Sequence, residues 1–124
     1  MSKRKETSSN SINKEYIIEC DLTYAISMVG GRWKLLILCR LEDGALRFSE
    51  LRRSICNITE RMLTLQLKEM EQDGLVRRTV YAEVPPRVEY ELTHTAKELI
   101  PVWKQLSDWG ARHRGCQMTV VKAG

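Results

Sequence analysis

The spacing of hydrophobic residues changes along the chain, from three or four residues before Gly74 to two residues after it. The strongest helical pattern lies within Asn57–Gly74, where Thr59 is a suitable N-cap and Gly74 a suitable C-cap residue. One face of this helix is apolar and consists of Leu63, Leu67 and Met70. The opposite face has mixed chemistry without an acid and consists of Arg61, Thr64, Leu65 and Lys68.

A shorter helix is predicted just before it, over Ser49–Ile55, with Ser49 as its cap. Only three residues, 56–58, separate the two helices. This arrangement is typical of the helix-turn-helix motif, whose second helix enters the major groove of DNA. We therefore expect Thr59 and the basic face of the second helix to lie near bases or phosphates. The first helix crosses the DNA backbone in this motif, and its candidates for phosphate contact are Ser49, Arg52 and Arg53.

Two further helices are predicted nearer the N-terminus. The first runs from Asp21, its expected N-cap, to Val29 and has a narrow apolar stripe. Two glycines follow it. The second runs from Arg32 to about Glu42 and is apolar on most of its surface, so we expect it at the centre of the core.

After the second helix of the motif, apolar and polar residues alternate in two segments, Val76–Tyr81 and Val88–Leu92, which predicts two strands. Two prolines lie in the loop between them and exclude it from a central strand. The expected fold is therefore mainly α with a small β-hairpin wing, a winged helix-turn-helix. From the wing, Arg78 or Arg87 would reach the sugar–phosphate backbone or the minor groove.

A final long helix is predicted from His94 to about Arg112, with Thr93 as its cap and a kink at Pro101. Its apolar side chains lie on more than one face, so its own domain cannot cover all of them. A second subunit is the natural cover.

At 124 residues the chain has the length of one domain with a modest core. We expect an N-terminal arm (1–19), the winged domain with its dimerisation helices (20–113) and a frayed C-terminal tail (114–124). The net charge of +4 permits a nucleic-acid partner without requiring one. The arm's basic residues are interpreted as a solubilising tail rather than as phosphate contacts; they are Lys3, Arg4 and Lys5.

Several classes of protein are disfavoured by what the sequence lacks. It has no signal peptide and no apolar run long enough for a membrane span, so a cytoplasmic location is expected. The four cysteines are scattered, without a Cys-x-x-Cys pair or nearby histidines, so we expect thiols, no metal and no cofactor. No nucleophile elbow, phosphate loop or paired-carboxylate motif supports an enzyme.

Short motifs between Cys20 and Arg112 follow an order typical of one family of regulators. They are Cys20–Thr23, Met28–Leu38, Phe48–Arg53, Arg61–Thr64, Asp73–Val76, Val84–Tyr90, Leu92–Thr93 and Trp109–Gly110. Together they resemble the HxlR-type, MarR-like winged helix-turn-helix regulators of transcription. The wing motif, Val84–Tyr90, is the most specific of them.

The resemblance implies a homodimer that binds double-stranded DNA at a pseudo-palindromic operator. In that family the first and last helices form the dimer. The corresponding interface candidates here are Leu22, Ile26, Trp103, Leu106 and Trp109.

The resemblance also makes Cys20 a candidate redox sensor, because the family includes members whose N-terminal cysteine responds to electrophiles or oxidants. Asp21 follows it, where the family often has proline, and a neighbouring carboxylate disfavours the reactive thiolate. Cys39 is interpreted as a core residue, and the pairing of Cys20 with Cys56 or Cys116 across a dimer stays open.

Two alternatives to a redox-responsive regulator remain. In the first, the cysteines are inert and a small-molecule effector controls DNA binding. In the second, the winged helix serves protein contacts alone. The last alternative predicts little or no salt dependence of DNA binding.

Overall fold

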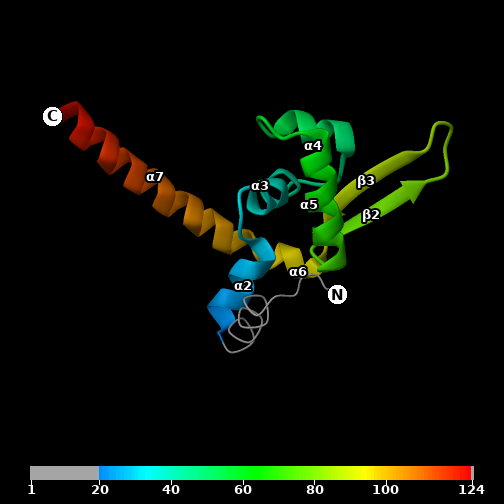
Figure 1. Cartoon of the computed structure of the whole chain (residues 1–124), viewed down its shortest axis with the longest axis horizontal. Coiled ribbons are helices and arrows are strands. Elements are labelled where there is room, and N and C mark those ends of the chain that lie inside the picture. Colours follow the sequence, from blue (N-terminus) through cyan, green and yellow to red (C-terminus); the bar gives the residue numbers. More distant parts are fainter. Residues whose placement is uncertain (1–19, 124) are drawn as a thin grey trace, which may run out of the picture.

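The computed structural model describes the backbone of residues 20–123 and the side chains of residues 20–116, so the predicted arm (1–19) lies outside the described residues. A helical body carries two projections, the β-hairpin and the last helix, which extend to opposite sides (Figure 1). The elements in chain order are α2 (Asp21–Val29), α3 (Lys34–Arg40), β1 (Leu46–Arg47), α4 (Phe48–Ser54), α5 (Glu60–Gln72), β2 (Val76–Tyr81), β3 (Arg87–Leu92), α6 (His94–Lys97) and α7 (Ile100–Ala123).

The predicted N-cap of α5, Thr59, is confirmed, whereas the C-cap is Asp73, one residue before the predicted Gly74. The Thr59 hydroxyl accepts a hydrogen bond from the Met62 N–H at 3.0 Å, which satisfies one of the helix's unpaired N-terminal donors. At the other end Gly74 adopts a φ of 78°, and the Leu75 N–H donates to the Met70 carbonyl at 2.9 Å. This left-handed glycine is typical of a Schellman ending, and it turns the chain directly into β2.

Two predicted N-caps lie one or two residues from the observed ones. The N-cap of α4 is Arg47 instead of Ser49, and the Glu50 carboxylate accepts from the Arg47 backbone N–H at 2.8 Å. The N-cap of α2 is Cys20, so Asp21 occupies the first turn, where the helix dipole favours an acid.

The wing is an antiparallel sheet with the strand order β1-β3-β2, in which β2 pairs with β3 from Val76↔Leu92 to Tyr81↔Arg87. Strand β1 was not predicted. It has only two residues and pairs with the base of β3, Leu46 opposite Tyr90.

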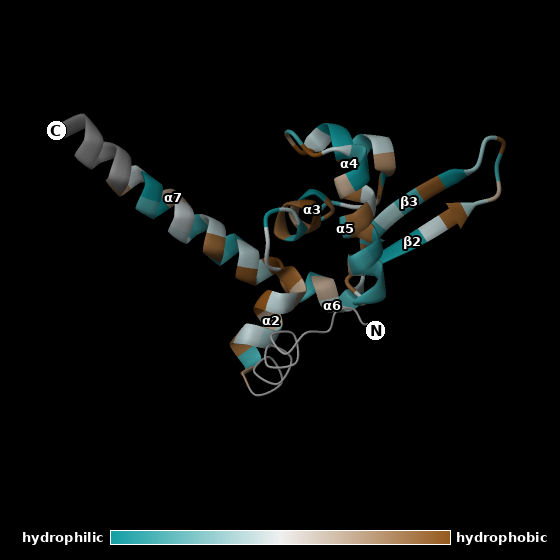
Figure 2. Ribbon diagram, viewed as in Figure 1, coloured by the Kyte–Doolittle hydropathy of each residue, from teal (hydrophilic) through white to brown (hydrophobic). Residues whose placement is uncertain are grey.

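The core lies where α3, α5 and the base of the wing meet, and the most apolar ribbon in Figure 2 is α3, as predicted. The fully buried large side chains of the core are Ile37, Leu38, Leu41, Leu51, Leu63, Leu67 and Met70. The Lys34 ammonium lies 3.0 Å from a carboxylate oxygen of Glu69, which ties α3 to the outer side of α5. The core thus fixes the orientation of α5.

The predicted last helix is two helices, α6 and α7, with Glu98 and Leu99 between them. Pro101 lies in the first turn of α7, where its missing N–H has no helical partner to lose. Helix α7 continues to Ala123, beyond the predicted end at Arg112. Trp103 donates its indole N–H to the Glu42 carboxylate at 3.0 Å and so holds the start of α7 against the end of α3.

No single helix in the described part of the chain has the length and hydropathy of a membrane span, although α2 and α3, bent by 69°, pass that test as a pair.

Candidate nucleic-acid interface

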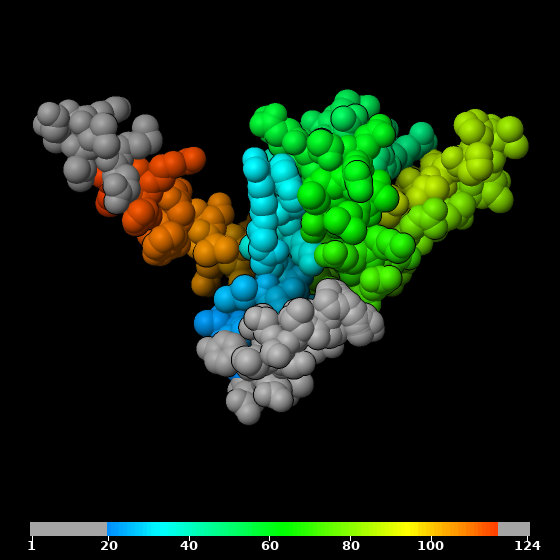
Figure 3. Space-filling model, in the orientation of Figure 1, coloured from blue at the N-terminus to red at the C-terminus, as the bar shows by residue number. Residues whose placement is uncertain are grey.

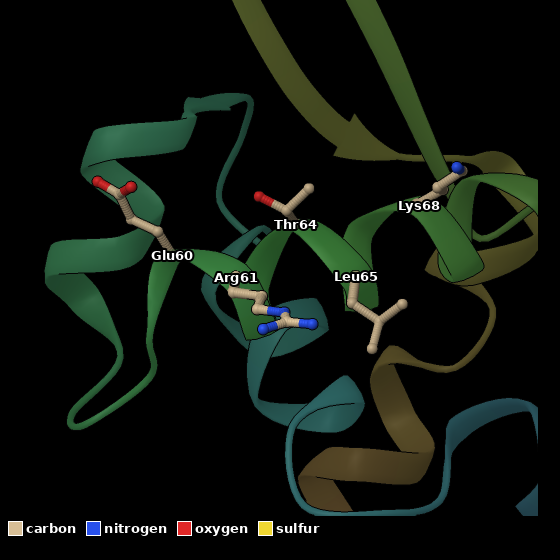
Figure 4. Close-up of a pocket in the computed structure, with 5 residues that line it drawn as sticks. All are labelled: Glu60, Arg61, Thr64, Leu65 and Lys68. Carbon is tan, nitrogen blue, oxygen red and sulfur yellow. The ribbon is translucent and has the colours of Figure 1, made fainter.

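The exposed face of α5 carries the residues predicted for base contact. Glu60, Arg61, Thr64, Leu65 and Lys68 line a shallow hollow along it (Figure 4). Arg61 and Leu65 extend to one side of the helix axis, and Thr64 and Lys68 extend to the other. Leu65 is 46% exposed, although it is a large apolar side chain.

Neither Arg61 nor Lys68 has an ion-pair partner among the residues that the structure describes. Cations without such a partner on an exposed helix face are able to exchange counterions for phosphate contacts without first losing an internal partner. Thr59 differs from them, because its hydroxyl oxygen already accepts the capping hydrogen bond.

The predicted phosphate contacts on α4 are exposed and lie beside the start of α5. Arg52 has a guanidinium nitrogen 3.7 Å from a carboxylate oxygen of Glu60. Ser49 and Arg53 are exposed, and Arg53 forms no ion pair within the described range. Arg52 therefore links the two helices of the motif, and Arg53 is the less constrained cation.

The two predicted wing contacts have different surroundings. Arg78 is exposed and forms no ion pair within residues 20–116. Arg87 donates to the Glu83 carboxylate at 2.9 Å and to that of Glu89, and its guanidinium lies 3.8 Å from the centre of the Tyr81 ring.

The contact of Arg87 with the DNA backbone stays a prediction, and in this structure its guanidinium is bound within the wing. A phosphate would have to displace two carboxylates and an aromatic ring that already bind the guanidinium. Hydrogen bonding to Arg87 also holds the pKa of Glu83 below its ordinary value. Sequence reasoning missed this cluster because its members come from different strands and the tip loop between them.

The surroundings of Cys20 also differ from the expectation. Hydrogen bonding from the Thr23 side chain, and then from the Thr23 backbone, holds the pKa of the Cys20 thiol below its ordinary value. The predicted opposing influence of Asp21 is not among the causes of this shift. A cysteine at a helix N-terminus has N–H donors that stabilise its thiolate.

The other cysteines lie in three different surroundings. Cys39 packs against the core, as predicted, and burial raises the pKa of its thiol. Cys56 and Cys116 are exposed, one after α4 and the other on α7. Within the described residues no group of three or more His, Cys, Asp or Glu side chains is suited to a metal ion.

Four of the five predicted dimer residues are exposed, namely Leu22 and Ile26 on α2 and Leu106 and Trp109 on α7. The fifth, Trp103, is only 5% exposed and belongs to the protomer's own core. Leu22, Ile26 and Leu106 line a wholly apolar groove of about 360 Å³ between α2 and α7. In the space-filling view α7 diverges from the helical body, and the side of the body that faces α7 is left uncovered (Figure 3).

Known proteins that resemble this chain are helix-turn-helix proteins, in agreement with the arrangement of α4 and α5. Residues 28–118 match the family described as HxlR-like helix-turn-helix. A curated relative from Methanothermobacter thermautotrophicus, an uncharacterized HTH-type transcriptional regulator, is 53% identical over 77% of this chain and 72% of its own length.

Two solved structures extend the likeness. The redox regulator HypR in its reduced form is 42% identical, with a TM-score of 0.76 over 81% of this chain and 99% of HypR. The reduced transcriptional regulator YodB from Bacillus subtilis is 38% identical, with a TM-score of 0.66 over 72% of this chain and 87% of YodB. The winged helix-turn-helix fold is thus confirmed. The chain belongs to the HxlR-like helix-turn-helix family, whose members are transcriptional regulators and not enzymes.

Proposed function

We propose that this protein is a cytoplasmic homodimer that binds a pseudo-palindromic operator with two copies of α5. The observation that carries the proposal is the exposed face of α5, where Arg61 and Lys68, two cations without an ion-pair partner among the described residues, flank Thr64 and Leu65. Such a face supplies phosphate contacts together with groups able to read base edges. In a symmetric dimer, two such helices would lie about 34 Å apart, one turn of DNA.

The dimer is supported by apolar side chains that the protomer leaves exposed. Leu106 and Trp109 on α7 and Ile26 on α2 are each more than half exposed. Apolar surface gathered on two adjacent helices is stabilised by burial against a second copy. The groove between the helices continues this surface toward the core.

Substitution of Arg61 tests the proposal. We expect Arg61→Ala to weaken binding to a duplex that the full-length protein selects from a randomised pool, by about 1–3 kcal/mol if the side chain reads a base. The matched control is Arg112→Ala, which removes an exposed cation from α7. Fluorescence anisotropy gives the affinity and light scattering the mass. Unchanged affinity, or loss of the dimer with Arg61→Ala, would show that Arg61 has another role.

We further propose that oxidants or electrophiles control DNA binding through Cys20. The support is the lowered pKa of its thiol at the start of α2, beside the proposed dimer surface. HypR and YodB, which are redox and transcriptional regulators by description, are similar in fold and sequence. Either Cys56 or Cys116 would serve as the second thiol of a disulfide, since both are exposed.

A small-molecule effector is the second candidate for control. The apolar groove between α2 and α7 favours it, because a ligand there would contact both helices of the proposed dimer. An apolar effector would change DNA affinity equally in the wild type and in Cys20→Ser, whereas an oxidant would act on the wild type alone.

A further inference from the structure

A carboxylate lies at one end of the hollow along α5. Among the described residues that line this hollow, Glu60 is the only acid, and the others are Arg61, Thr64, Leu65 and Lys68. Figure 4 shows the Glu60 side chain extending from the start of α5 toward α4. In a helix-turn-helix, residues near the N-terminus of the second helix contact base edges. Glu60 therefore occupies a position from which a base is within reach.

Structural roles account for only part of this placement. The helix dipole favours an acid in the first turn, but this effect does not depend on which side of the helix the acid faces. The pairing of Glu60 with Arg52 is loose, because the guanidinium nitrogen and the carboxylate oxygen are 3.7 Å apart and the side chains are 72% and 46% exposed. Exposed pairs of this kind add little to stability. The carboxylate is thus held beside α4 and still presents acceptor oxygens to solvent.

The surface of duplex DNA rejects a carboxylate at most positions. Phosphates carry the same charge, and guanine and thymine present only acceptors in the major groove, at N7 and O6 and at O4. Burial of a charged group without a hydrogen-bond partner is costly. The available donors are the amino groups at cytosine N4 and adenine N6, and adenine also places its N7 acceptor beside N6. Cytosine is therefore the base that a carboxylate contacts with the least repulsion.

We propose that Glu60 determines specificity for a cytosine in each half of the operator. Its carboxylate accepts a hydrogen bond from the cytosine N4 amino group in the major groove, whereas guanine or thymine at this position leaves it facing acceptors. The inference rests on the proposed function, DNA binding through α5. The cations of α5 attract any duplex, and the acid penalises the wrong ones.

Substitution of Glu60 by glutamine provides the first test. The reduced, full-length wild type and Glu60→Gln each select duplexes from a randomised pool. We expect one position in each half-site to change from cytosine to adenine, because a glutamine amide pairs with N6 and N7 of adenine. The matched control is Glu71→Gln, which removes the same charge from an exposed position on α5 outside the hollow and should select the wild-type sequence. The same base preferences in the wild type and Glu60→Gln would overturn the role of Glu60.

A modified base provides the second test. Replacing the selected cytosine with 2-pyrimidinone removes the 4-amino group, and the wild type and Glu60→Ala then meet the same weakened base pair. By fluorescence anisotropy we expect the wild type to lose affinity about tenfold, a typical effect of one wrong base pair, and Glu60→Ala to lose clearly less. The Thr59 cap does not involve the Glu60 side chain, so the start of α5 is retained.

The outcomes separate this inference from the proposed function. An equal loss of affinity for the wild type and Glu60→Ala would overturn the cytosine contact and leave DNA binding through α5 in place. Failure of the wild type to select any duplex would contradict DNA binding through α5, and the inference with it.

Discussion

The thiol of Cys20 gains its chemistry from its position at the start of α2. The hydrogen bonds that lower its pKa come from the Thr23 side chain and from backbone N–H groups of the first turn. Hydrogen bonds to a thiolate stabilise the charged form, so they lower the pKa. The sequence shows Asp21 beside Cys20 but does not show that the helix begins between them.

Removal of the Thr23 hydroxyl tests this account. We expect Thr23→Val to raise the pKa of Cys20, because the largest cause of its lowering is the Thr23 side chain. The measurement is the rate of Cys20 alkylation by iodoacetamide as a function of pH, in proteins whose other cysteines are changed to serine. The midpoint of this pH profile should be higher with Thr23→Val than with Thr23. The same midpoint in both proteins would contradict the role of Thr23.

The response to oxidants is a separate prediction. Cys20→Ser should keep its DNA affinity in the presence of diamide, whereas the wild type loses affinity, because only a reactive thiol is converted to a disulfide. Cys39→Ser is a matched control, since burial raises the pKa of that thiol. An equal loss of affinity in the wild type and Cys20→Ser would exclude Cys20 from the switch.

Among the elements, α7 is joined to the end of α3 by one carboxylate in addition to apolar packing. Glu42 accepts the indole N–H of Trp103 at 3.0 Å and lies 3.1 Å from the Lys104 ammonium. The Trp103 hydrogen bond, followed by that of Lys104, lowers the pKa of Glu42. Both oxygens of one side chain thus hold the first turns of the long helix.

This attachment predicts a pH dependence. Because the pKa of Glu42 is lower in the folded protein, its contribution to stability is complete above the ordinary glutamate pKa, about 4.3, and is lost as the pH falls through the lowered value. Glu42→Gln should therefore lower the thermal midpoint at pH 7, and the difference from the wild type should shrink at acidic pH. A difference that is constant with pH would contradict the ionic attachment.

The elements that sequence predicted well are those with local signals. Helix α5 has a cap, an apolar face and a terminal glycine within eighteen residues. Apolar and polar residues alternate along β2 and along β3. β1 has no local signal, because two residues become a strand only through pairing with β3. The division of the last helix was likewise missed, since Pro101 signals a break but not its position.

The candidate site was predictable to a similar degree. The face of α5 follows from helical periodicity alone, so Arg61, Thr64, Leu65 and Lys68 were found. The pairing of Arg87 and the burial of Trp103 depend on residues distant in sequence, on other elements, and no periodicity reveals them. Glu60 is not part of the predicted face, and only the structure places it in the same hollow.

At the scale of the whole molecule, the proposed function assigns the two projections to different partners. The wing and α5 face the proposed DNA, and α7 with α2 provides the proposed surface for a second copy (Figure 1). The dimer then sets the spacing of the two recognition helices, which a single protomer cannot do.

A charge on the proposed dimer surface should separate the copies. We expect Leu106→Glu to give a monomer, because the carboxylate would be buried without a partner in the interface. Val84→Glu is a matched control, since it adds the same charge to an exposed apolar side chain on the wing. Light scattering after gel filtration measures both masses. A dimer that persists in Leu106→Glu would place the interface elsewhere.

The central claim, that the face of α5 reads DNA, is tested most directly by the affinity of the reduced wild type for a selected duplex and for a random one over a salt series. The account predicts tighter binding to the selected duplex and affinities that fall steeply with salt, since cations contact phosphates while base contacts add specificity. Equal affinity for both duplexes, or affinity that does not change with salt, would contradict it.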